Sequence, residues 1–131
     1  MIVYCCADLI FATKIQSTCD ALGLTARPAR NEAMLQKRLD RVEDGKPNGA
    51  VAAVLIDLDR GDEALPLIAQ CKQHAVPPTV VAWGPHVLVD LLKQAKKAGA
   101  DEVMTRGSFT ANLPALLQQL SSAAAETKGD A

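Results

Sequence analysis

Continuous apolar stretches alternate along this chain with stretches in which apolar residues recur every three or four positions. The first pattern is typical of buried strands, and the second is typical of helices that pack one face against a core. Five strands are predicted, over residues 1–6, 24–28, 50–58, 79–83 and 101–105. The run AVAAVLIDL at 50–58 is uninterrupted and rich in small and branched side chains, so we expect this strand to be buried on both faces.

Five helices are predicted in the segments that follow these strands. Asp8 is a suitable N-cap for the first helix and Gly23 a suitable stop, while Asn31 can cap the second helix. Pro85 suits the first turn of the fourth helix. Residues 43–49 are rich in turn formers and predict a loop. The fifth helix is expected to face the core with Leu113, Leu116, Leu117 and Leu120.

Five βα units in sequence predict a single α/β domain over residues 1–120. Because the connections are short, the crossovers should be right-handed, which makes the fold a doubly wound, five-stranded parallel sheet with helices on both faces. Residues 121–131 are small and polar, and we expect them to form a flexible C-terminal tail.

Composition excludes several classes of function. The chain has 131 residues and a net charge of −1, and aromatic residues make up 3% of it, so neither nucleic acid nor an acidic lipid surface is an expected partner. No apolar window is long enough to span a membrane. The start MIVYCCADL lacks the features of a signal peptide, so a cytoplasmic protein is expected. The spacing of the cysteines and histidines indicates neither a zinc site nor a disulfide framework.

Candidate site residues follow the predicted strands. In a parallel sheet the carboxyl ends of the strands meet at one edge, where functional groups gather. The residues at that edge are Cys6, Ala7 and Asp8 after the first strand, Asp57 and Asp59 at the third, Gly84, Pro85 and His86 at the fourth, and Thr105 and Arg106 at the fifth. No glycine-rich phosphate loop and no nucleophile elbow is present, so the sequence does not predict an enzyme.

Two motifs resemble those of a known family. The run AVLIDLD, with Asp57 at its end, is similar to the phosphoacceptor strand of bacterial response-regulator receiver domains, and AGADEVMTRGSF is similar to their fifth strand. The resemblance implies a receiver-like, flavodoxin-like (βα)5 fold and a role in two-component signal transduction. It also implies that Asp57 is the phosphoacceptor equivalent, with Gly84 at the position of a Ser or Thr and Arg106 at the position of a Lys.

The remaining positions depart from the receiver pattern. Receiver domains hold Mg²⁺ with an acidic pair after the first strand, where this chain has Cys6 and Ala7, and Asp8 lies one step too late. Gly84 lacks a hydroxyl, and arginine is not equivalent to lysine at a tight site. Ordinary Mg²⁺-dependent phosphorylation is therefore not expected, and the chain is interpreted as a degenerate receiver, or pseudo-receiver, that needs neither a metal nor a cofactor.

Several side chains at this edge have two interpretations. Asp57 could form an ion pair with Arg106, or it could be a working acceptor with a metal site completed by Asp8 or Asp59. His86 could contact a ligand, or it could close its loop onto Asp57 or a backbone carbonyl. Cys6, beside a helix N-terminus, could have a lowered thiol pKa.

The expected function is a phosphorylation-independent signalling module that binds another protein. The partner is not identified, and a homodimer is one possibility. The resemblance implies a contact surface formed by the fourth helix, fifth strand and fifth helix, with Trp83, Val103 and Phe109 as candidates. The alternatives are a single-domain response regulator phosphorylated on Asp57 through a non-standard Mg²⁺ site, or a small-anion site formed by Asp57, His86 and Arg106.

Overall fold

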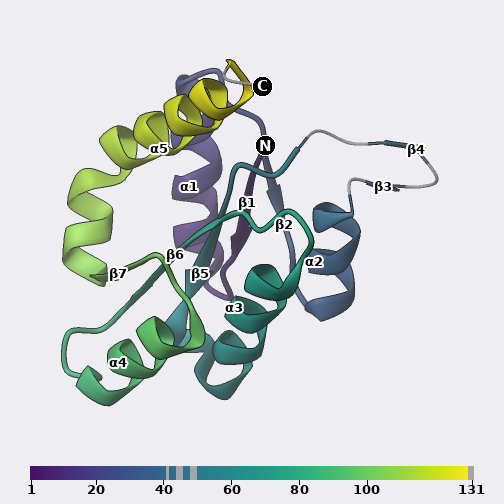
Figure 1. Ribbon diagram of the computed structural model, residues 1–131. Coiled ribbons are helices and arrows are strands. Elements are labelled where there is room, and N and C mark those ends of the chain that lie inside the picture. The colour runs from purple at the N-terminus through teal and green to yellow at the C-terminus, as the bar shows by residue number, and fades with distance from the viewer. Residues whose placement is uncertain (41, 44–45, 48–49, 130–131) are drawn as a thin grey trace.

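The computed structural model describes residues 1–40, 42–43, 46–47 and 50–129 (Figure 1). Within these residues the chain forms a five-stranded sheet in the order β2-β1-β5-β6-β7, and all of its neighbouring strands are parallel. The strands of this sheet are β1 (Ile2–Cys5), β2 (Ala26–Pro28), β5 (Ala53–Asp57), β6 (Thr79–Gly84) and β7 (Glu102–Thr105). The prediction of a doubly wound parallel sheet is confirmed.

Helices cover both faces of the sheet (Figure 1). One face packs against α1 and α5, and the other against α2, α3 and α4. The helices are α1 (Leu9–Ala21), α2 (Glu32–Leu39), α3 (Ala64–Gln73), α4 (Val89–Ala98) and α5 (Arg106–Gly129), with a 3-10 segment, η1 (Leu58–Glu63), between β5 and α3. None of the described helices is long and apolar enough to cross a membrane.

The central strand β5 is buried on both faces, as its sequence predicts. Val54 and Ile56 pack into the core under α2, α3 and α4, while Ala53 and Leu55 pack into the core under α1 and α5. This alternation follows from the two-residue period of a strand. Asp57 is the last residue of β5, so the strand that anchors both cores also sets the position of the candidate site.

The predicted signals at the helix ends are present. The Asp8 carboxylate accepts hydrogen bonds from the amides of Ile10 and Phe11, and the Asn31 side chain accepts one from Met34. Gly23, just after α1, has a φ of 73°, a conformation that glycine adopts without a steric penalty. These local interactions explain where α1 begins and ends and where α2 begins.

Some boundaries differ from the prediction. Strand β2 begins at Ala26 rather than at residue 24, and α5 begins at Arg106 and continues through residues 121–129. The helix therefore extends into the segment predicted as a tail, whose flexibility stays a prediction. In the predicted loop, β3 (Val42–Glu43) pairs with β4 (Lys46–Pro47), while residues 44–45 and 48–49 lie outside the described residues.

Pro85 does not begin a helix. The amide of Leu88 donates to the Pro85 carbonyl at 3.0 Å, so residues 85–88 form a turn, and α4 starts at Val89. The proline thus fixes a turn between β6 and α4. This places His86 and Val87 in the turn, where both side chains are exposed.

Asp101 ties α3 to the sheet. One of its carboxylate oxygens accepts hydrogen bonds from Lys72 Nζ at 2.8 Å and from the amide of Val80 at 2.7 Å. Burial raises the pKa of Asp101, but the hydrogen bonds from Lys72 and Val80 outweigh that effect and hold the pKa below its ordinary value of 3.8. The ionised carboxylate is therefore the form that stabilises the fold.

Substitution Asp101→Ala should lower the free energy of unfolding by about 1 kcal/mol at neutral pH, because two charge-assisted hydrogen bonds are lost at a partly exposed site. Since the folded pKa is lowered, this stabilisation is present above the ordinary carboxyl pKa and is lost as the pH falls through the folded value. Urea unfolding at pH 7 and pH 3 measures it. Glu102→Ala, at an exposed neighbour, is the control, and an equal loss in both variants would contradict the prediction.

Candidate functional site

Asp57 lies at the carboxyl edge of the sheet with 2% of its surface exposed. It caps η1, because its Oδ1 accepts a hydrogen bond from the amide of Asp59 at 2.9 Å. In the sheet it is in register with Trp83 of β6. The orientation of the carboxylate is therefore fixed by the hydrogen bond from η1 and by the pairing of β5 with β6.

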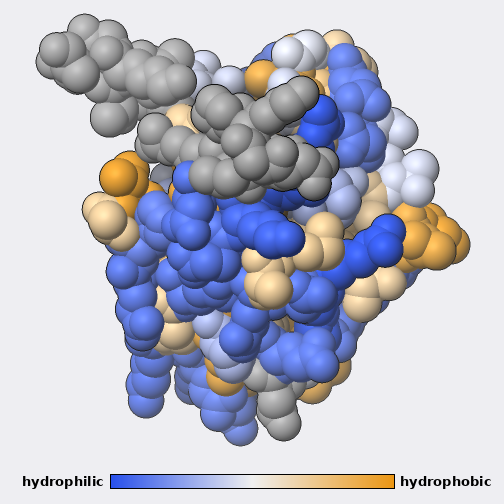
Figure 2. All heavy atoms as spheres, turned by 90° about the vertical axis from the view of Figure 1, so that its right-hand side faces the viewer, coloured by the Kyte–Doolittle hydropathy of each residue, from blue (hydrophilic) through white to orange (hydrophobic). Residues whose placement is uncertain are grey.

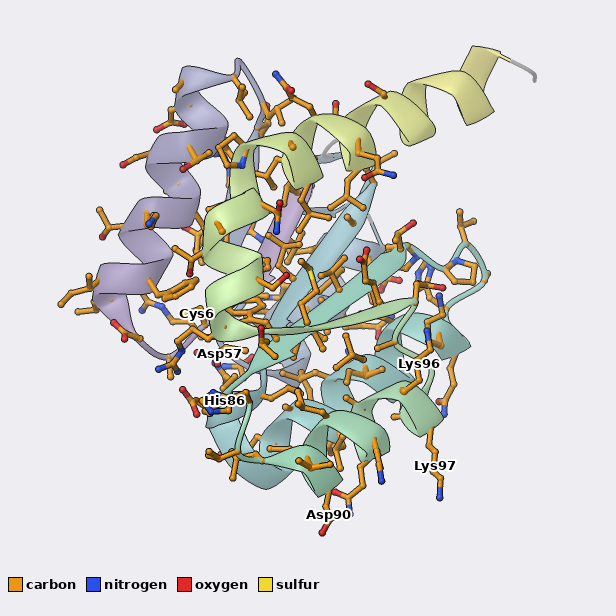
Figure 3. All side chains as sticks on the ribbon, turned by 90° about the vertical axis from the view of Figure 1, so that its left-hand side faces the viewer. Cys6, Asp57, His86, Asp90, Lys96 and Lys97 are labelled. Carbon is orange, nitrogen blue, oxygen red and sulfur yellow. The ribbon has the colours of Figure 1, made fainter. Side chains whose placement is uncertain are left out.

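The second oxygen of Asp57 contacts Cys6. The thiol Sγ of Cys6 lies 3.5 Å from Asp57 Oδ2, at hydrogen-bond distance, and 3.4 Å from the backbone carbonyl of Asp8 (Figure 3). Cys6 follows β1, which pairs directly with β5, so the sheet register brings the two residues together. The thiol thus lies beside the carboxylate and donates to it.

The Cys6 thiol is protonated at neutral pH. Burial raises its pKa to about 12, the charge of Asp57 acts in the same direction, and a hydrogen-bonding contribution from the Asp8 backbone only partly opposes them. The hypothesis of a lowered thiol pKa at Cys6 is wrong. The nearby carboxylate and the burial outweigh the helix N-terminus on which that hypothesis depended.

Asp57 also has a shifted pKa. Burial raises the pKa of Asp57 above its ordinary value of 3.8, while the Cys6 thiol and the positive charge of Arg106 lower it in part. The net upward direction means that the site holds the ionised carboxylate at a cost to stability.

Arg106 forms an ion pair with Asp59, not with Asp57. The side chains of Arg106 and Asp59 are 43% and 37% exposed, whereas Asp57 is buried. The predicted Asp57–Arg106 ion pair is therefore wrong: the guanidinium lies near the surface and pairs with the more exposed of the two carboxylates. Its charge still acts on Asp57 over a longer distance. The pairing with Asp59 leaves Arg106 poorly placed to hold a free anion.

Gly84 is required for close packing. A Cβ atom on Gly84 would lie 3.0 Å from the Cβ of Leu58, which is fully buried in η1. Gly84 is not among the glycines with a positive φ, so it is this close approach that favours glycine here. Leu58 thus fills the space beside Gly84 at this edge of the sheet. Leu58 was not predicted as a site residue, although it directly follows Asp57 in the run AVLIDLD.

His86 lies at the same edge of the sheet as Cys6 and Asp57 (Figure 3). Its exposed ring forms no hydrogen bond to any residue that the structure describes, so the predicted closure onto Asp57 or a carbonyl is not present. The ring is free to meet a ligand or partner. Ala7 is exposed at this edge but offers no ligand atom, and the Asp8 carboxylate is engaged in capping α1.

Trp83 and Phe109 are core residues. Their rings stack at 4.1 Å with an interplanar angle of 1°, Phe11 stacks against both, and Trp83 and Phe109 are fully buried. The prediction that Trp83 and Phe109 lie at an interface is therefore wrong, because both residues belong to the core between the sheet and helices α1 and α5. Val103 is half-buried and lines a groove between α4 and β7 with Val89 and Leu92.

The atoms around Asp57 do not suit Mg²⁺. This ion prefers carboxylate oxygens and waters, but the neighbouring positions supply a protonated thiol at Cys6, a methyl group at Ala7 and a cap-forming carboxylate at Asp8. Among the residues with described side chains, no group of three His, Cys, Asp or Glu side chains is arranged to hold a metal ion.

No protein-family model and no curated protein matches this chain. Several solved structures match the fold of this chain. A response regulator from Thermotoga maritima superposes with a TM-score of 0.72 at 20% identity, over 92% of this chain and 96% of that one. The receiver domain of NtrX from Brucella abortus gives 0.72 at 13% identity, over 92% and 97%.

A third structure, a response regulator from Burkholderia pseudomallei with a phosphorylated aspartic acid, gives a TM-score of 0.66 at 22% identity and covers 98% of this chain and 71% of that one. At these identities the likeness shows the fold. The chain is therefore a receiver-like domain in its architecture, and its chemistry has to be argued from its own residues.

Asp57→Asn should raise the free energy of unfolding above that of the native chain, and this difference should grow as the pH rises from 4 to 7. The folded pKa of Asp57 is raised, so the native chain has the full stability of the neutral carboxyl at low pH and loses it as the pH rises through the folded value. Urea unfolding at both pH values measures the difference, with Asp90→Asn on exposed α4 as the control. A difference that shrinks toward pH 7 would be the opposite result.

Gly84→Ala should cost about 1–3 kcal/mol of stability, because the new methyl group overpacks against Leu58 in a core without spare space. Gly107→Ala is the matched control, since a Cβ there would meet no heavy atom within 4 Å. Thermal unfolding of the two variants compares them. Equal melting temperatures would show that the contact between Gly84 and Leu58 relaxes without cost.

Proposed function

We propose that this chain is a non-enzymatic, receiver-like signalling domain that acts through protein contacts and without Mg²⁺-dependent phosphorylation of Asp57. The observation that carries the proposal is the hydrogen bond from the Cys6 thiol to the Asp57 carboxylate. A protonated thiol occupies the place beside the acceptor aspartate where phosphoryl chemistry needs a metal ligand.

The chemistry of phosphoryl transfer supports this proposal. Such a reaction depends on cations and hydrogen-bond donors that stabilise the charge on the transferred group. Around Asp57, Arg106 is paired with Asp59, and the space beside Gly84 holds the apolar side chain of Leu58. The acceptor oxygens are also occupied, one by the Cys6 thiol and the other by the Asp59 amide.

The described surface is consistent with a partner that binds near α4. Val87, Leu88 and Val89 are 71%, 40% and 51% exposed, and Val89 is continuous with the groove that Leu92 and Val103 line. The side of the molecule that carries α2 is mainly hydrophilic (Figure 2). A contiguous apolar surface is typical of a protein contact site. The partner is then another protein or a second copy of this chain, met in the cytoplasm.

The proposal predicts no response to phosphoryl analogues. Addition of Mg²⁺ with beryllofluoride should leave the amide NMR shifts of Asp57 and Gly84 unchanged, and acetyl phosphate with Mg²⁺ should add no mass to the intact protein. Asp57→Asn is the control for any adduct. A mass increase of one phosphoryl group that this variant abolishes would overturn the proposal and establish a working single-domain response regulator.

A gain-of-function variant makes the negative result informative. Cys6→Asp places a second carboxylate beside Asp57, which restores the type of oxygen ligands that Mg²⁺ binds. Millimolar Mg²⁺ should then raise the melting temperature of Cys6→Asp by about 2 °C or more and leave the native chain unchanged. Cys6→Ser, which restores no charge, is the matched control. An equal shift for the native chain would show that it already has a metal site.

A further inference from the structure

A pocket of about 270 Å³ lies between α1 and the end of β2, beside Cys6. Its apolar walls include Leu9, Ala12 and Pro28, and Leu9 is 79% exposed. An occupant would therefore remove apolar surface from water, which favours binding. Pockets for drug-sized ligands measure about 300–1,000 Å³, so this one suits a smaller molecule.

The floor of the pocket is polar and already ordered. The Tyr4 hydroxyl donates to Gln16 Oε1 at 2.9 Å, and Gln16 Nε2 donates to Asp20 at 3.1 Å. The Tyr4 proton is thus used within the protein, while its oxygen can still accept a hydrogen bond. This floor fixes the shape of the pocket, but the Tyr4 hydroxyl has no proton left to donate to a bound anion.

Arg30 supplies that donor at the mouth of the pocket. Among the described residues that line the pocket, it alone carries a charge, and its exposed guanidinium forms no hydrogen bond or ion pair with any described residue. Its backbone is fixed, because its carbonyl accepts a hydrogen bond from Arg60 NH2 at 2.6 Å and the Arg60 side chain is 10% exposed. A fixed backbone with a free guanidinium suits bidentate binding of a carboxylate.

We propose that this pocket binds a small organic acid, with its carboxylate on Arg30 and its apolar body against Leu9, Ala12 and Pro28. A short-chain or monocyclic carboxylate has the required size and the required single charge. Apolar walls combined with one charged group at the rim are the usual composition of a small-molecule site.

The pocket is coupled to Asp57 through Cys6. Cys6 lines the pocket, and its thiol donates to the Asp57 carboxylate. An occupant that contacts the thiol would therefore change the environment of Asp57 as well. The inference does not rest on the proposed function, since the pocket can take an acid whether or not Asp57 accepts a phosphoryl group.

Amide NMR titration tests the proposal with four probes: benzoate, butyrate and their neutral counterparts benzamide and butyramide, at constant ionic strength. The acids should cause saturable shifts at Cys6, Ala12 and Gln16, with a smaller shift at Asp57. The amides should bind at least about tenfold more weakly, because they lack the charge that pairs with Arg30.

Two arginine variants distinguish the pocket from general charge attraction. Arg30→Ala should weaken the binding of benzoate at least about tenfold. Arg27→Ala, at an exposed arginine of β2 that does not line the pocket, should change it less than twofold. Three results would each overturn the proposal. These are equal affinities for the acids and the amides, equal effects of the two variants on benzoate binding, or amide NMR shifts confined to another part of the chain.

Alkylation gives an independent readout. Cys5, Cys19 and Cys71 are buried, so iodoacetamide should label the native chain at Cys6, which Cys6→Ser checks. Because the Cys6 thiol is largely protonated, the labelling is slow and is followed over a prolonged incubation at alkaline pH. Saturating benzoate should slow this labelling at least threefold, and benzamide at the same concentration should not. An unchanged rate with benzoate would show that the acid does not occupy the pocket beside the thiol.

Discussion

The burial of the Asp57 carboxylate at the end of the central strand is the constraint on which the rest of the site depends. Strand β5 packs into both cores, so its last residue cannot move toward solvent without disturbing them. A carboxylate held there needs hydrogen-bond donors, because an unpaired buried charge is costly. The Asp59 amide and the Cys6 thiol provide them. The site is thus satisfied by the protein itself.

The fold determines where this edge of the sheet lies, and the residues at the strand ends determine its chemistry. The parallel sheet brings the ends of β1, β5, β6 and β7 to one edge, whichever residues they carry. Here those ends hold a thiol, a carboxylate and a glycine packed against Leu58. Fold and chemistry are determined by different residues, so likeness of fold to receiver domains does not establish their reaction.

The aromatic residues strengthen this edge from within. Trp83 is in register with Asp57 and stacks with Phe11 and Phe109, which connects β6 to both α1 and α5. Stacked rings add stability beyond the apolar area that they bury. The side of the site that faces α1 and α5 is therefore packed, whereas the turn at His86 and the start of α4 are exposed.

The sequence by itself determined the class of fold and the five strands and five helices of the main sheet, although not all of their boundaries. Hydrophobic periodicity and local caps such as Asp8 and Asn31 depend on neighbours along the chain, so they are readable without coordinates. It also placed Cys6, Asp57, Gly84 and Arg106 at one edge. Only the tertiary structure decided which of these atoms meet. Arg106 pairs with Asp59, and Gly84 contacts Leu58, because the tertiary structure brings these distant segments together. The raised pKa of the Cys6 thiol and the burial of Trp83 likewise depend on packing between segments far apart in the chain.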